Sequence, residues 1–162
     1  MKKICYLSSF APGQPKLFDL DESVDWMGEL LTELNEEISK KELQELDEEF
    51  FISFEGEALR KTTGKLEDHV KFSGKLSAVF GTKCINSGRP MVDNIEIEVK
   101  FVVIATELIA RYGYEEETTL FVDDGEYELY TTEDNRFDIK EIIHEFIWLN
   151  KDQYPSLESK ED

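Results

Sequence analysis

Cysteine is scarce in this chain of 162 residues, which contains only Cys5 and Cys84 in distant parts of the sequence. Small secreted domains that depend on disulfides carry more cysteines, and redox or zinc motifs place them at short spacing. The sequence therefore predicts neither a disulfide framework nor a thioredoxin-like pair. A reducing, cytoplasmic location fits this cysteine content best.

Long apolar runs are also missing. The longest candidate, residues 101–105, has the length of a strand, whereas a helix needs about 20 apolar residues to cross a bilayer. Residues 4–11 follow two lysines, but they include Ser8 and Ser9 and lead into Pro12 without a small-residue cleavage pattern. We therefore expect no signal peptide and no membrane association.

Positive charge is the third scarce feature, because 18 Lys and Arg stand against 37 Asp and Glu and give a formal charge of −19. The acidic excess is concentrated in residues 17–49 and 106–162, whereas residues 50–105 are nearly neutral. Proteins bind duplex nucleic acid through basic residues that neutralise phosphates. We therefore exclude duplex DNA as a direct partner and expect a basic partner to be attracted.

Motifs of catalysis are absent as well: there is no G-x-S-x-G, Gly-rich phosphate loop or H-E-x-x-H. A zinc site built from Cys5, Cys84, His69 and His144 is possible by residue type, but their spacing is not that of a compact zinc motif. With 37 acidic residues, carboxylate pairs arise by chance. We predict a protein that is not an enzyme and has no metal or cofactor; a hydrolase using acidic residues near His144 is the less favoured alternative.

Aromatic residues are plentiful, and 11 Phe, 6 Tyr and 2 Trp supply enough apolar area for a core. We predict a single domain over residues 1–154 and a disordered acidic tail at 155–162. Within the helical acidic segment 17–49, apolar residues recur every three or four positions and predict an amphipathic helix over 21–38. These residues are Val24, Met27, Leu30, Leu31, Leu34 and Ile38. Ser39 and Glu42 then form a capping box for a second start.

The apolar period changes to two in the middle of the chain. Residues 50–60, 69–80 and 93–104 predict three antiparallel strands. The predicted strands occupy residues 50–131. Their fold class is α+β: an antiparallel sheet of about 3–5 strands with an N-terminal helical segment and a C-terminal helix packed on the sheet.

The remaining elements follow from local turn and cap signals. Asp124-Gly125 predicts a hairpin between residues 118–122 and 127–131. Residues 105–113 fit either a strand or a short helix. Asp138 and Glu141 form a capping box that predicts a helix over 138–149.

The order of three sequence features resembles a known family. A strand VKFSGKLSAV at residues 70–79 leads to a cysteine turn and a proline, and FDIKEII at residues 137–143 begins the late helix. Over about residues 68–150, this order resembles the bacterial large ribosomal RNA subunit accumulation proteins, the YceD-like family.

The turn in that family is typically C-x-x-C followed by a proline. Cys84 and Pro90 match this pattern, but Ser87 stands at the second cysteine position. A serine hydroxyl is not a competent zinc ligand at neutral pH, so we expect no metal at this turn. Gly88 provides a permissive backbone for the turn, and Pro90 fixes the backbone where the next strand begins.

The resemblance implies a cytoplasmic factor needed for large-subunit ribosomal RNA to accumulate, without catalytic residues to carry over. The charge of −19 favours a basic ribosomal protein, or an assembly intermediate of the large subunit, as the partner. We expect Glu29, Glu33 and Glu36, on the exposed side of the first helix, to attract it. The alternative is a direct RNA-binding module that uses basic residues of the middle segment. These residues are Lys71, Lys75, Lys83, Arg89 and Lys100.

Overall fold

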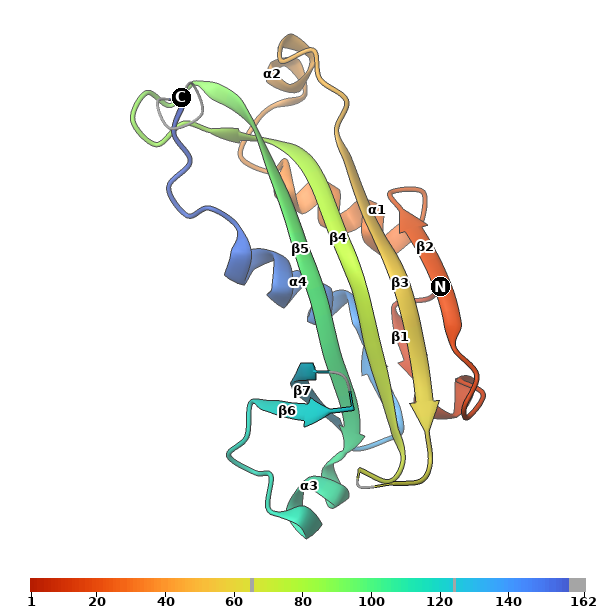
Figure 1. The fold of residues 1–162 in the computed structure, drawn as a ribbon. Coiled ribbons are helices and arrows are strands. Elements are labelled where there is room, and N and C mark those ends of the chain that lie inside the picture. Colours follow the sequence, from red (N-terminus) through yellow and green to blue (C-terminus); the bar gives the residue numbers. More distant parts are fainter. Residues whose placement is uncertain (65, 124, 158–162) are drawn as a thin grey trace.

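The computed structural model describes residues 1–64, 66–123 and 125–157, and within them the chain forms a six-stranded sheet and a two-stranded ribbon (Figure 1). The strands of the sheet, in spatial order, are β2 (Lys16–Asp21), β3 (Phe51–Lys61), β4 (His69–Lys83), β5 (Pro90–Ala105), β7 (Gly125–Thr132) and β6 (Thr119–Val122). Strands β1 (Ile4–Tyr6) and β8 (Arg136–Asp138) make the ribbon. The short 3-10 helix η1 (Leu7–Ser9) follows β1.

The predicted fold class is wrong in its sheet. The three strands predicted in the middle of the chain are confirmed as β3, β4 and β5, each antiparallel to the next. However, the sheet has six strands among the described residues and is mixed, because β7 lies parallel to β5. Parallel neighbours need a crossover connection, and here α3 (Thr106–Tyr112) and β6 provide it.

Strand β2 was missed because it is short and its pattern is irregular. Only Phe18 and Leu20 of its six residues are buried, while Leu17 is 77% exposed. Two buried positions are too few to define a period of two. The register of β2 is set instead by its pairing with β3, where Leu20 lies opposite Phe54.

Two helices, α1 (Asp25–Leu34) and α4 (Ile139–Asn150), lie behind the long strands in Figure 1 and contact the same face of the sheet. Buried apolar residues of both helices join Phe72 and Phe101 of the sheet in the main core. The Phe72 and Phe101 rings stack with centroids 4.6 Å apart. The predicted packing of the C-terminal helix on the sheet is therefore confirmed.

The helix ends follow the predicted capping signals. Ser39 and Glu42 form the reciprocal capping box at the start of α2 (Lys40–Glu45). The Glu141 backbone N–H donates to the Asp138 carboxylate at 3.1 Å and begins α4. Helix α1 is shorter than predicted, because the Asp21 carboxylate accepts hydrogen bonds from the Ser23 backbone N–H and hydroxyl and holds a turn before the helix.

A second, smaller core lies on the other face of the sheet. Phe101 and Val103 point into the main core, whereas Val102 and Ile104 belong to this second cluster, as strand alternation requires. Helix α3, strand β6 and strand β7 cover it at the lower end of the sheet in Figure 1. Of the two structures considered for residues 105–113, the helix is found, over Thr106–Tyr112, and Gly113 caps it with a φ of 72°.

The predicted hairpin is confirmed, since β6 pairs antiparallel with β7 and Val122 lies opposite Gly125. Asp124 of its turn lies outside the described residues.

No helix in the described part of the chain is long and apolar enough to cross a membrane.

Candidate functional site

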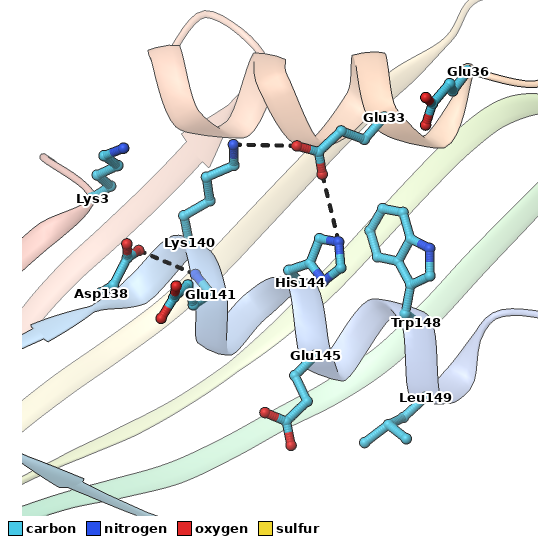
Figure 2. A pocket seen from close by; sticks show the side chains of 10 residues that line it. All are labelled: Lys3, Glu33, Glu36, Asp138, Lys140, Glu141, His144, Glu145, Trp148 and Leu149. Carbon is cyan, nitrogen blue, oxygen red and sulfur yellow. Dashed lines mark hydrogen bonds and ion pairs between the residues drawn. The ribbon is translucent and has the colours of Figure 1, made fainter.

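A groove of about 1130 Å³ runs between α1 and α4 on the side of the helices that faces away from the sheet (Figure 2). Its lining contains five carboxylates against two lysines, together with an imidazole, an indole and a leucine. The lining residues are Lys3, Glu33, Glu36, Asp138, Lys140, Glu141, His144, Glu145, Trp148 and Leu149. The groove therefore combines negative charge with apolar surface.

Helical spacing places these side chains opposite one another. Residues four apart lie on one side of a helix, so Lys140, His144 and Trp148 form a stripe along α4. In Figure 2 this stripe faces Glu33 and Glu36 at the C-terminal end of α1. The apolar faces of both helices are buried against the sheet, and the groove forms where their polar flanks meet.

A single lysine bridges the two helices. The Lys140 Nζ lies 2.7 Å from Glu29 Oε2 and 3.3 Å from Glu33 Oε1. Its hydrogen bond and charge lower the pKa of Glu29, and the hydrogen bond to Glu29 in turn raises the pKa of Lys140. Both groups are therefore held in their charged forms, and this end of the groove is partly neutralised.

An aromatic stack stands next to this ion pair. The His144 and Trp148 rings are parallel, with centroids 3.9 Å apart and an interplanar angle of 6°. The His144 Nε2 lies 3.6 Å from Glu33 Oε2, which is buried and accepts no hydrogen bond from the described residues. Glu33 thus has one oxygen paired with Lys140, whereas its other oxygen is buried beside His144.

The predicted partner-binding acids are brought together, but their surroundings differ from the expectation. Glu29 and Glu36 are exposed as predicted, but Glu29 and Glu33 pair with Lys140 of α4, and of the three only Glu33 and Glu36 line the groove. Only Glu36 makes no ion pair or side-chain hydrogen bond within the described residues. The α4 stripe was not recognised from the sequence, although the four-residue spacing of Lys140, His144 and Trp148 could have revealed it.

The family turn is not part of the groove lining; it lies at the top of Figure 1 between β4 and β5, where Cys84 shares a smaller pocket with Glu37 and Lys151. The Gly88 N–H donates to the Cys84 carbonyl at 2.8 Å, Gly88 has a φ of 70°, and Pro90 begins β5. Hydrogen bonds from the Ser87 side chain and then from the Leu157 backbone lower the pKa of the Cys84 thiol to about 6. The turn therefore favours the thiolate form of Cys84.

Residues 155–157 of the predicted disordered tail contact this turn. The Ile85 N–H donates to the Pro155 carbonyl at 2.8 Å, and the Leu157 N–H donates to Cys84 Sγ at 3.5 Å. The rest of the predicted tail, residues 158–162, lies outside the described residues.

The structure brings together three of the five basic residues of the RNA-binding alternative, because Lys75 and Lys100 line one hollow and Lys71 and Lys100 lie by the same tyrosine ring. Lys75 pairs with Glu96 at 2.7 Å, while the ammonium groups of Lys71 and Lys100 both lie 5.4 Å from the centroid of the Tyr127 ring. Lys83 and Arg89 flank the turn at the other end of β4, about 40 Å from Lys71 at 3.3 Å per residue.

The possible zinc ligands are separated in the same way. His69 begins β4 and Cys84 follows its last residue, so about 45 Å of strand lies between them. Across the described ranges, no group of three or more His, Cys, Asp or Glu side chains is placed to hold a metal ion.

Comparison with protein-family models, curated proteins and solved structures found no match to this chain.

Proposed function

We propose that this protein is a non-enzymatic ribosome-biogenesis factor that supports the accumulation of large-subunit ribosomal RNA by binding a basic ribosomal protein. The observation that carries the proposal is the groove between α1 and α4, where five carboxylates line one concave surface. The order of strand, cysteine turn and late helix supplies the link to ribosome assembly through its resemblance to YceD-like proteins.

The groove suits a basic polypeptide segment for two reasons. Its volume of about 1130 Å³ can receive several side chains, which is more than a single ion requires. Its charge complements Lys and Arg and speeds their encounter. Leu149, which is 77% exposed, and the half-buried Trp148 add the apolar contact that holds a partner after the encounter.

Direct binding of RNA is less well supported. Lys71, Lys75 and Lys100 each have an acidic or aromatic neighbour within the fold. The acids around them would repel phosphates, since the chain carries a charge of −19. A basic protein is attracted by the same acids, so the charge favours protein over RNA as the partner.

The experiment that tests this proposal is a pull-down from lysate with and without nuclease. The proposal predicts that a basic ribosomal protein is captured and that its capture survives nuclease. Capture that disappears with nuclease would instead support the RNA-binding alternative, and capture of neither would remove both.

A groove variant makes the pull-down specific. Glu33→Gln combined with Glu36→Gln should weaken capture, because it removes two charges from the groove lining. Glu55→Gln combined with Glu57→Gln, on the far face of the sheet, is the matched control. Equal loss in both variants would contradict binding in the groove.

A further inference from the structure

Trp148 lines the groove, and within the described residues His144 is the one aromatic ring stacked on it. A parallel stack covers one face of an indole, and His144 takes that face at a centroid distance of 3.9 Å. Trp148 remains half-buried rather than enclosed. Figure 2 shows its other face turned toward the end of the groove that lies beneath Glu36.

Glu36 is the carboxylate that lies beyond this free ring face. It is exposed, and within the described residues its side chain makes no ion pair. Lys140, one of the two lysines that line the groove, is paired at the other end with Glu29 and Glu33. At one end of the groove, Lys140 pairs with acids of α1. At the other end, Glu36 and Trp148 offer a carboxylate and an aromatic face to which a cation of a partner can bind.

A planar cation fits this end better than a spherical one. A guanidinium group can stack flat on an indole while its edge N–H groups pair with a carboxylate. The ammonium of lysine is a compact, strongly hydrated charge and loses more hydration at such a surface. The combination of an indole face with an adjacent carboxylate thus distinguishes arginine from lysine.

We propose that the groove recognises an arginine of its basic partner, with the guanidinium stacked on the free face of Trp148 and paired with Glu36. This inference rests on the proposed binding of a basic segment in the groove and adds the side chain that is selected.

The test compares two unstructured peptides of equal length and charge, one with arginine and one with lysine as its only basic residue type. Dissociation constants are measured by calorimetry against the full chain. We expect the arginine peptide to bind about two- to five-fold more tightly, a fraction of the full cation–π energy because lysine also makes such a contact. Trp emission should change on binding, and this change reports on Trp148 because Trp26 is only 3% exposed.

Variants test whether the preference for arginine over lysine arises at Trp148 and Glu36. Trp148→Ala should remove most of the arginine preference, whereas Phe121→Ala should keep it, because the 82% exposed Phe121 lies on β6 away from the groove. Because Trp148 also packs against the main core, Glu36→Gln provides a second test at an exposed position. It should reduce the preference, and Glu57→Gln, an exposed acid on β3, should not.

The possible results separate this inference from the proposed function. Equal binding of both peptides would overturn arginine recognition and leave the binding of basic segments intact. Binding of neither peptide would overturn the proposed function itself. An arginine preference that persists in Trp148→Ala and in Glu36→Gln would overturn the site.

Discussion

The groove between α1 and α4 can be compared with the uncovered face, which is the part of the opposite side of the sheet that lies beyond the second core. Both carry acidic residues, but the side chains beside the acids differ. On the sheet, a hollow of about 630 Å³ is lined by four acids, two lysines and two apolar side chains: Asp19, Glu55, Glu57, Glu98, Lys75, Lys100, Leu17 and Phe18. In the groove, the acids border an aromatic stack and an exposed leucine. Both surfaces therefore combine an excess of acids with apolar side chains, but the stacked indole belongs to the groove.

This difference matters because the rate at which a partner is attracted and the affinity with which it is held have different physical causes. Long-range charge accelerates the encounter of a basic partner with any acidic face. Affinity comes mainly from a few apolar or aromatic contacts that become desolvated. Both faces can thus attract a basic protein, but the groove alone of the two also has an indole available for stacking.

The sharpest contrast between the two faces of the sheet is in stability. Phe72 is fully buried on the helix-covered face and contacts four other Phe rings. Phe72→Ala should lower the free energy of unfolding by about 3–5 kcal/mol. Its neighbour Ser73 lines the hollow on the uncovered face, and Ser73→Ala should change it by less than about 0.5 kcal/mol. Urea unfolding measures both, and similar losses would show that the two faces are not distinct.

A smaller loss is expected where β3 and β4 approach closely. Gly56 lies opposite Gly74, and a Cβ on Gly74 would come within 2.4 Å of the Glu55 carbonyl oxygen. Gly74→Ala should therefore push the strands apart and cost about 1–3 kcal/mol of stability. Gly125→Ala is the control, since its Cβ would meet only the Lys100 Nζ at 3.4 Å. A Gly74→Ala protein as stable as the control would contradict the close approach.

The second core should make stability depend on pH. His69 is 3% exposed, and burial lowers its pKa in the folded state below the usual value of 6.5. As pH falls below about 6.5, the unfolded chain takes up a proton that the folded chain resists, so this contribution to stability is lost with acidification. Urea unfolding above and below pH 6.5 should show a steeper loss in the wild type than in His69→Leu. An identical pH dependence in both would contradict a neutral, buried His69.

The smallest expected effect concerns Lys140, one of the two lysines that line the groove. Lys140→Met removes the partner of Glu29 and Glu33 and should accelerate association with a basic peptide, because the groove becomes more negative. The matched variant on the uncovered face is Lys75→Met, which releases Glu96 and should change the rate less. Stopped-flow association rates measure both, and a larger effect of Lys75→Met would reverse the comparison.

Local patterns in the sequence were sufficient for the elements that depend on neighbouring residues. Strands β3 to β5 follow from an alternation sustained over many residues, and α2 and α4 begin at the predicted capping residues. The position of β7 beside β5 depends instead on contacts between distant segments. No local period reports such pairing, which explains why the mixed sheet was not predicted.

The same limit applies to the groove. The sequence indicated that Glu29, Glu33 and Glu36 lie away from the buried stripe of α1, but not that α4 packs beside them. Their meeting with Lys140 and Trp148 depends on both helices sharing one face of the sheet. The negative charge of α1 could therefore be predicted from the sequence. The groove could not, because it forms only where α1 and α4 pack side by side on the sheet.

The most direct test of the groove as the binding surface compares two triple variants with equal changes of net charge. One reverses Glu29, Glu33 and Glu36 to Lys, and the other reverses Glu55, Glu57 and Glu98 on the uncovered face. Circular dichroism first establishes that both variants are folded. Association rates with the arginine peptide are then measured from low salt to about 0.15 M, where the screening length is about 8 Å.

We predict that the wild-type rate falls as salt rises and that the groove variant associates more slowly than the uncovered-face variant at every salt concentration. A rate that does not depend on salt, or equal slowing in the two variants, would contradict the central claim that a basic partner binds between α1 and α4.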